Sequence, residues 1–486
     1  MPAVGYMHVS GRLEHDFFCV HLVLLCEELS SVEKKRVWCM KTLSKTELLS
    51  IGLMMFSIFF GAGNLIFPPA LGQAAGDHLL PAIIGFLFTG VGLPLLGVVA
   101  IALKGGKYTE FIESHVSPRF ALLLLGILYL TIGPLFAIPR TGAVSFEIGI
   151  RPFISEDHVT LGQFVYTAVF FILTYFFALN PSKIVARVGK LLTPILLLFL
   201  AVLFIRAFAV PLGGIMESTG PYTGTPFLQG FQDGYLTMDL LASLAVGAIV
   251  VNAVRMEGIE EARSIGRICI IGGLISVTCM SAVYLSLGYL GATSASVMGL
   301  SANGGVILSQ AAGLFFGPMG QVLLAVIIGF ACLTTSIGMA SACSWYFNTA
   351  SHGRISYQRL LFFSTLFSFA VSNIGLTRLI QVSVPFLITI YPVVIVLVVL
   401  SLFDGVFGGR RSVYRWGIGF TLAFSIFGGL NAAGLKIDAV DALFSRYLPL
   451  YASNLGWLVP AAAGIAVGGV VSLLSDGAEN RQELVK

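Results

Sequence analysis

Charged side chains are scarce in this sequence. Asp, Glu, Lys and Arg make up only 11% of its 486 residues, whereas hydrophobic residues make up 57% and the mean hydropathy is +0.92. Soluble globular proteins carry about 25% charged residues. A deficit of this size over the whole length means that most of the surface faces lipid rather than water. The small net charge of +4 gives no indication of a nucleic-acid partner.

Patterns typical of several other protein classes are absent too. The seven cysteines fall at 19, 26, 39, 269, 279, 332 and 343, with no CxxC pair and no histidine cluster, which disfavours a disulfide framework or a zinc site. The sequence contains no HExxH, GxSxG or Walker A motif, so neither an enzyme nor an ATP-driven pump is indicated, and we expect no bound cofactor. A channel would usually show a repeated filter segment or a charged ring.

Apolar runs long enough to cross a bilayer recur along the chain, which predicts an all-α integral membrane fold. A membrane helix needs about 20 largely apolar residues. We count twelve such runs, near 46–71, 79–103, 119–150, 160–179, 188–211, 227–254, 266–292, 318–347, 356–374, 379–403, 414–433 and 454–475. The Gly-, Ala- and Ser-rich segment 293–317 is predicted to be a long loop that can include short re-entrant helices.

The distribution of Lys and Arg predicts the orientation in the membrane. If the N-terminus is cytoplasmic, the inner loops hold fourteen of these residues and the outer loops four. The inner ones are Lys104, Lys107, Arg119, Lys183, Arg187, Lys190, Arg255, Arg263, Arg267, Arg354, Arg359, Arg410, Arg411 and Arg415; the outer ones are Arg151, Arg378, Lys436 and Arg446. We therefore predict that both termini are cytoplasmic. Residues 1–39 are too polar to span and lack the layout of a signal peptide, so we expect an upstream extension of the reading frame or a disordered tail.

The first span carries residues that interrupt a helix. Gly61, Gly63 and Asn64 lie in mid-span, and Pro68 and Pro69 follow them. Irregular backbone at membrane depth is tolerated only where it lines a cavity or is buried in protein. We predict a discontinuous helix whose unwound part offers carbonyl and N–H groups to a cation and a zwitterion. The alternative is close helix packing through the small residues.

The sixth span has a comparable weak point at 239–247, between Asp239 and Gly247. Spans one and six correspond if the transporter domain, 40–486, contains two five-span repeats, 46–211 and 227–403. An odd number of spans per repeat makes the second repeat inverted, and 414–475 supplies two extra helices outside it. Interrupted spans at corresponding positions point to the substrate site of an inverted-repeat transporter.

Ionisable residues inside spans are costly, so each is a candidate for function. They include Arg140 and Glu147 in span three, Arg206 near the outer end of span five, and Asp239 in span six. Arg140 and Glu147 are two helical turns apart, too distant to pair directly. Arg206 is expected to reach towards the membrane surface. Asp239 could attract an ammonium group or bind a proton, or it could have a buried structural partner.

Span eight contains three adjacent hydroxyl residues, Thr334, Thr335 and Ser336. Such hydroxyls commonly donate back to carbonyls of their own helix. Beside an unwound, carbonyl-rich segment they would instead be suitable oxygen ligands for Na⁺. The sequence leaves both interpretations open.

Three motifs resemble one known family. They are Gly61-Ala62-Gly63-Asn64-Leu65-Ile66-Phe67-Pro68-Pro69 in span one, Gly133-Pro134-Leu135-Phe136-Ala137-Ile138-Pro139-Arg140-Thr141-Gly142-Ala143 in span three, and Ala331-Cys332-Leu333-Thr334-Thr335-Ser336-Ile337-Gly338 in span eight. From about Met40 onward the chain resembles the bacterial branched-chain amino acid:cation symporters. The resemblance implies a plasma-membrane carrier that imports leucine, isoleucine and valine with Na⁺ or H⁺, in the inverted-repeat fold shared with neurotransmitter:sodium symporters.

The resemblance also implies the roles of individual residues. The carbonyls of Ser57 and Phe60 would join Ala331, Thr334 and Thr335 around a sodium ion. The substrate-binding residues would be Gly61, Ala62, Gly63 and Asn64 in span one, which contact the charged ends of the amino acid, and Ser243, Leu244, Ala245, Val246 and Gly247 in span six, which line its side-chain pocket. The alternative is a proton-coupled carrier of another small amino acid or amine, with Asp239 as the proton-binding group.

Overall fold

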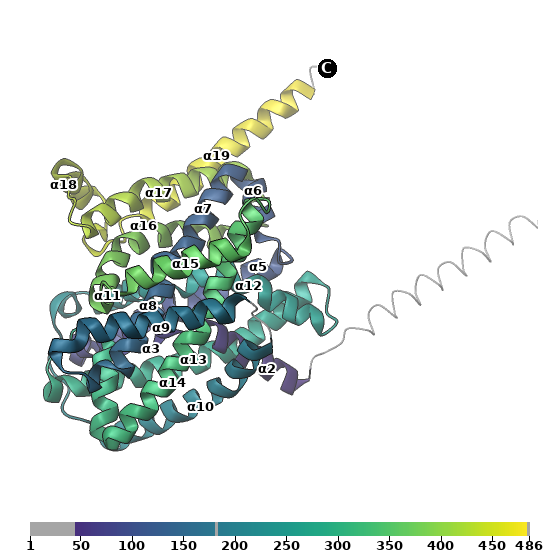
Figure 1. The fold of residues 1–486 in the computed structure, drawn as a ribbon. Helices are drawn as coiled ribbons and strands as arrows, with labels where there is room; N and C mark the ends of the chain where they lie inside the picture. The colour runs from purple at the N-terminus through teal and green to yellow at the C-terminus, as the bar shows by residue number, and fades with distance from the viewer. Residues whose placement is uncertain (1–43, 180–182, 484–486) are drawn as a thin grey trace, which may run out of the picture.

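The computed structural model describes residues 44–179 and 183–483, without the side chains of 183–194 and 475–483. Its described part is helical and contains no strand (Figure 1). The predicted N-terminal extension, 1–39, lies outside the described residues. The α-helices are α2 (Lys45–Phe59), α3 (Ala62–Ala75), α4 (Leu79–Leu87), α5 (Leu93–Leu103), α6 (Tyr108–His115), α7 (Pro118–Leu130), α8 (Ala137–Gly149), α9 (Val159–Leu179), α10 (Lys183–Ala209), α11 (Pro226–Asp233), α12 (Asp239–Met256), α13 (Ala262–Met298), α14 (Gly304–Ala350), α15 (Tyr357–Ser372), α16 (Leu376–Leu402), α17 (Arg411–Ala432), α18 (Asp438–Tyr447) and α19 (Leu458–Glu483).

Each predicted span coincides with a helix or with consecutive helical segments, and the all-α membrane fold is confirmed. Seven helical stretches within the described residues are long and apolar enough to cross a bilayer. They are Ala62–Leu103, Pro118–Phe153, Glu156–Leu179, Asp239–Met256, Ala262–Met298, Gly304–Ala350 and Leu376–Leu402. Two shorter apolar helices, Ile195–Ala209 and Leu458–Leu474, add to them.

The segment 293–317, predicted to be a long loop, is mostly helical. Helix α13 continues to Met298, and α14 begins at Gly304 after the cap residue Asn303, whose Oδ1 accepts hydrogen bonds from two backbone N–H groups. Gly317 then adopts a left-handed φ of 66° and bends α14 just before Pro318. The loop prediction was wrong because small residues here allow close packing. A methyl group at Gly304 would lie only 1.7 Å from the carbonyl oxygen of Ile66.

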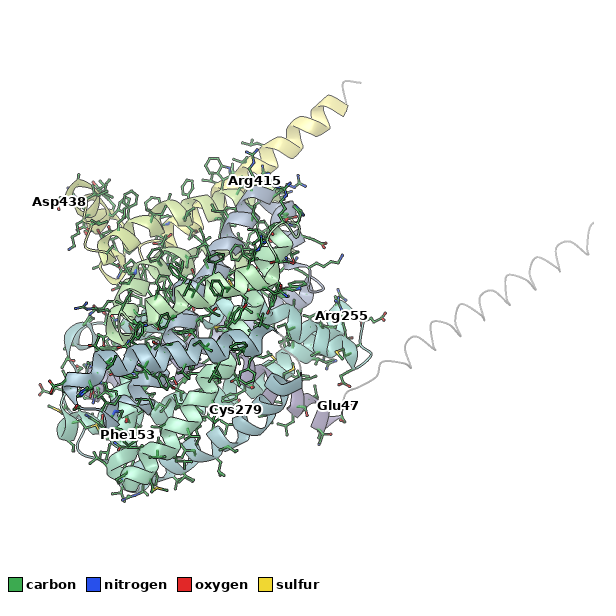
Figure 2. All side chains as sticks on the ribbon, viewed as in Figure 1. Glu47, Phe153, Arg255, Cys279, Arg415 and Asp438 are labelled. Carbon is green, nitrogen blue, oxygen red and sulfur yellow. The ribbon has the colours of Figure 1, made fainter. Side chains whose placement is uncertain are left out.

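Successive membrane spans should place the loops between them at alternate ends of the bundle, and the labelled residues can be followed on this point. Figure 2 shows Glu47, Arg255 and Arg415 towards one end, and Phe153 and Asp438 towards the other. The pair α17 and α19 lies together at one edge of the bundle (Figure 1). Gly464 of α19 lies against α17 so closely that a methyl group there would be 2.5 Å from the Trp416 carbonyl oxygen.

Helix α3 packs backbone to backbone against α13. A methyl group at Gly72 would lie 2.0 Å from the carbonyl oxygen of Gly288, and one at Gly291 would lie 2.1 Å from that of Pro69. Real side chains cannot approach this closely, so glycine is required at both contacts. The second half of the first broken span is therefore held firmly against α13, whose Tyr284 reaches the site described below.

An ion-paired cluster joins α5 and α6 to the segment between α16 and α17, at the end of the bundle marked by Arg415. Lys104 Nζ lies 2.7 Å from Asp404 Oδ2, and the hydroxyl of Tyr414 donates to Asp404 Oδ1 at 2.8 Å. Partial burial raises the pKa of Asp404, but hydrogen bonds from Lys104 and Tyr414 outweigh it and leave the pKa below its ordinary value. Since Lys104 and Tyr414 both bind this carboxylate, we interpret the cluster as a structural contact between helices.

Candidate functional site

The first span is broken, as predicted. Helix α2 ends at Phe59, the next two residues are extended, and α3 begins at Ala62. The side chain of Asn64 caps the new helix by accepting a hydrogen bond of 3.0 Å from the N–H of Gly61. Pro68 and Pro69 do not form the break but lie inside α3. The break is therefore short and is held by a side chain from its own span.

The sixth span is also broken, but not where the sequence indicated. Helix α11 ends at Asp233, a 3₁₀ turn covers Gly234–Thr237, and Met238 adopts a left-handed φ of 64°. Helix α12 then runs without interruption from Asp239, so the predicted weak point at 239–247 is wrong. A left-handed conformation is uncommon for a residue other than glycine, and nothing about a methionine predicts it.

The small residues that suggested a break at 239–247 instead allow α12 to pack closely on α5. The Ser243 hydroxyl donates to the Leu240 carbonyl of its own helix at 2.7 Å, and it lies where a methyl group on Gly97 would clash. Likewise, a methyl group on Gly247 would lie 2.5 Å from Ile101. Leu244 is buried, whereas Ala245 and Val246 keep part of their surface exposed.

The two breaks meet through Asn64 and Asp239. Asn64 Nδ2 donates to Asp239 Oδ2 at 2.6 Å, and it also donates to the hydroxyl of Tyr284 from α13. Asn64 and Asp239 are both buried, with 2% and 4% of their surface exposed. Of the alternatives considered for Asp239, a buried structural partner is the one that the hydrogen bonds support. One amide thus caps the first break and ties it to the second.

Arg140 approaches both breaks from α8. Its Nη1 donates to the Leu236 carbonyl at 2.5 Å, and its Nη2 donates to the Thr237 carbonyl at 3.3 Å. The guanidinium also lies over the ring of Phe67, 5.2 Å from its centroid. On the other side, a methyl group at Gly63 would lie only 2.8 Å from Nη2. Carbonyls freed by the second break therefore receive donors from span three.

The other two intramembrane charges lie away from the breaks. Glu147 forms an ion pair of 3.2 Å with Arg151, near the C-terminal end of span three, and also contacts the amide of Asn303. Arg206 lies over the ring of Phe315, 5.4 Å from its centroid. The prediction that Arg140 and Glu147 do not pair directly is confirmed. Arg140 and Asp239 are therefore the two charges among these four that belong to the site.

Thr334 and Thr335 donate back to their own helix. Both hydroxyls bond to the carbonyl of Ala331, at 3.0 Å and 2.9 Å. The same face of α14 lies beside the first break, since a methyl group at Gly61 would be 3.5 Å from Cγ2 of Thr335. A donating hydroxyl still carries lone pairs, so back-bonding and cation binding are compatible. The Ser57 side chain is exposed, whereas Phe60 is buried.

A groove of about 280 Å³ lies between α9 and the middle of α14. Its lining is mainly apolar, including Val169, Phe170 and Phe330, and contains none of the predicted substrate residues. Among the described residues, no group of three or more His, Cys, Asp or Glu is arranged to hold a metal ion.

Sequence reasoning missed Tyr284 and the role of Arg140 as a contact between the breaks. Arg140 was visible as a charge in mid-span, but its partners could not be inferred because they are backbone carbonyls 96 and 97 positions away in the chain. Tyr284 carried no signal at all, since a tyrosine within an apolar helix is ordinary.

Comparison with known proteins identifies the family. A family profile described as "Branched-chain amino acid transport protein" matches residues 44–475. The branched-chain amino acid permease BraB of Bacillus subtilis is 44% identical over 438 residues, which cover 90% of this chain and 98% of BraB. The branched-chain amino acid transport system 2 carrier protein of Pseudomonas aeruginosa is 44% identical over 431 residues, which cover 88% of this chain and 96% of the carrier protein.

The fold has a counterpart among solved structures. Mhp1, a nucleobase-cation-symport-1 family transporter solved in a closed conformation with bromovinylhydantoin bound, superposes with a TM-score of 0.55. The identity is 12%, with 87% of this chain and 91% of that chain covered. At this identity the likeness concerns the fold alone, and it supports the predicted inverted-repeat architecture. The chain belongs to the branched-chain amino acid transport protein family, and it is a membrane transporter rather than an enzyme.

Proposed function

We propose that this protein imports leucine, isoleucine and valine together with Na⁺ across a bacterial plasma membrane, with both termini in the cytoplasm. The observation that carries the proposal is the junction of the two broken spans through Asn64 and Asp239. Broken helices that meet within a transporter expose backbone polar groups where substrate and coupling ion bind. The names of the related permeases and carriers supply the substrate class.

The first break supplies groups suited to an amino acid. The N-terminal end of α3, at Gly61–Asn64, carries the positive end of a helix dipole and favours a carboxylate. Ala245 and Val246 of α12, which keep part of their surface exposed, are proposed to contact the aliphatic side chain. A single methylene in such a pocket is worth about 1–3 kcal/mol, so one carrier is expected to accept all three branched-chain amino acids.

The proposed sodium site lies between α2 and α14. The last four carbonyls of a helix lack partners within that helix, so the C-terminal end of α2, with Ser57 and Phe60, can offer oxygens at the break. Across from them, Ala331, Thr334 and Thr335 would supply one carbonyl and two hydroxyl oxygens. Bound together, Na⁺ and amino acid would favour closure of one helix bundle over the site and so drive alternating access.

Uptake of radiolabelled leucine into proteoliposomes tests the proposal, with an inward Na⁺ gradient and then with a proton gradient alone. We expect accumulation that needs Na⁺ and is competed by isoleucine and valine. Uptake driven by protons alone would favour the alternative coupling ion and direct attention to Asp239. Absence of leucine uptake under both gradients would contradict the proposed substrate.

The double variant Thr334→Ala/Thr335→Ala tests the ion site. Loss of two oxygen ligands should raise the Na⁺ concentration for half-maximal uptake by about tenfold or more, since 1.4 kcal/mol already corresponds to tenfold. Thr349→Ala is the matched control, because the Thr349 hydroxyl also bonds back within α14, to Trp345 at 3.0 Å, far from the break. Equal Na⁺ dependence in the double variant and the control would rule out this site.

A further inference from the structure

The guanidinium of Arg140 has hydrogen-bond donors that the protein does not use. A guanidinium carries five N–H donors. Two bonds, to the carbonyls of Leu236 and Thr237, are formed, whereas Nε is buried and has no partner. The residue as a whole is only 5% exposed. A buried donor without a partner is costly, and more so when it is charged.

The positive charge of Arg140 also lacks a paired carboxylate. No ion pair of 4.0 Å or shorter joins Arg140 to Asp or Glu in the part of the chain that the structure describes. The nearby carboxylate of Asp239 is bound by Asn64 instead. An unpaired charge in a membrane interior is expensive, which is why such residues usually mark a functional site.

The guanidinium lies beside the helix end at which the substrate carboxylate is proposed to bind. Nη2 lies against Gly63, at the N-terminal end of α3, and approaches this closely only because Gly63 has no side chain. The helix end and the guanidinium thus direct positive charge to the same place. Carboxylate and guanidinium form paired, charge-assisted hydrogen bonds that are stronger than neutral ones.

We propose that Arg140 binds the α-carboxylate of the transported amino acid, using the N–H groups that the protein leaves free. This inference rests on the proposed function and adds a specific receptor to it. If Arg140 served only to bind the carbonyls of Leu236 and Thr237, its Nε donor would have no partner and its positive charge no counterpart. With the carboxylate in place, the same side chain would link the substrate to both breaks, so that occupancy favours their closed arrangement.

Ligands that differ only in the carboxylate test this proposal on purified protein in the presence of Na⁺. Leucinamide keeps the ammonium group and the side chain of leucine but lacks the negative charge. In the wild-type protein, we expect leucine to bind about 100-fold more tightly than leucinamide, as measured by competition with radiolabelled leucine. In Arg140→Gln, the affinity for leucine should fall by about 100-fold, whereas the affinity for leucinamide should change by less than about threefold. The ratio of leucine affinity to leucinamide affinity should therefore approach one. Arg140→Lys should give an intermediate ratio, because lysine keeps the charge but not the paired geometry.

Arg206→Gln is the matched control, since it removes another arginine from a span without approaching the breaks. Its leucine-to-leucinamide ratio should equal that of the wild type. If neither Arg140 variant folds, Gly63→Ala, which places a methyl group against Nη2, is measured in the same way and should lower the leucine-to-leucinamide ratio by about tenfold. A ratio that survives in Arg140→Gln, or in Gly63→Ala where that variant is used, would overturn this inference alone. A wild-type protein that binds no leucine would overturn the proposed function and this inference together.

Discussion

Spans one and six are both interrupted at the centre of the protein, yet the two breaks are built differently. In span one, two extended residues separate α2 from α3, and Asn64 of the same span caps the new helix. In span six, a 3₁₀ turn and the left-handed Met238 separate α11 from α12, and α12 has no side-chain cap. The freed carbonyls of Leu236 and Thr237 instead accept hydrogen bonds from Arg140 of span three.

This difference means that the first break supports itself, whereas the second depends on its neighbours. Asn64 satisfies a backbone group three residues away, as a helix cap does in any context. The second break holds a strained residue and carbonyls whose donor comes from another span. Strained conformations persist only where the surroundings impose them, and they are concentrated at functional sites. A change of state in the transporter is therefore expected to act mainly on the second break.

Asn64→Ala should have the largest effect, because it removes the cap of one break and the partner of the other. It leaves the buried Asp239 carboxylate without its amide donor and should lower the free energy of unfolding by about 3 kcal/mol. Leucine uptake should be lost with it. Chemical unfolding in detergent measures the first effect, and proteoliposome uptake the second.

Asn431→Ala is the matched control for that experiment. Asn431 also donates to an aspartate and a tyrosine, Asp441 and Tyr451, both at 2.8 Å, but it is only partly buried and lies at the C-terminal end of α17. We expect a loss of about 1 kcal/mol and nearly normal uptake. Equal losses of unfolding free energy and of uptake in the two variants would show that the contact between the breaks matters no more than the contact made by Asn431.

Gly63→Ala and Gly61→Ala sharpen the comparison within the first break. A methyl group at 63 would lie 2.8 Å from Arg140, whereas one at 61 would make an ordinary contact of 3.5 Å with Thr335. Gly63→Ala should therefore weaken leucine binding by about tenfold, or about 1.4 kcal/mol. Gly61→Ala should weaken it by less. The reverse order would mean that the approach of Arg140 does not matter for binding.

Asp239→Asn removes a charge from the second break but keeps an oxygen that can accept from Asn64. Since the hydrogen bond loses its charge assistance, we expect a loss of about 1 kcal/mol in unfolding free energy. Sodium-driven leucine uptake should fall by less than about threefold, which is under 1 kcal/mol. Complete loss of uptake at normal stability would instead indicate that the charge takes part in coupling.

Ser243→Ala should have the smallest effect. Its hydroxyl donates to a carbonyl of its own helix and packs towards Gly97, so the variant should change stability by about 0.5 kcal/mol or less. Uptake and leucine affinity should stay close to wild type. A large loss of leucine affinity would place Ser243 at the substrate, as the family resemblance implied.

The spans and the first break could be predicted because their signals are local. Twenty apolar residues predict a membrane helix wherever they occur, and two glycines with an asparagine disfavour a continuous one. The second break could not be located in the same way. Residues 234–238 contain one glycine and otherwise ordinary side chains, so nothing there predicts a break. The run at 239–247 is rich in small residues, which wrongly suggested that the helix is interrupted there. That run is a stable helix because its small residues fit against α5.

The sequence by itself determined that the chain spans a membrane, that its apolar segments are helical, and that span one is interrupted. These properties follow from hydropathy and from the preferences of Gly, Pro and Asn, which act over a few residues. Only the tertiary structure decided where span six breaks, that Asn64 binds Asp239, and that Arg140 lies between the two breaks. These contacts join residues roughly a hundred or more positions apart. The packing of several helices sets them, so no single stretch of the chain contains them.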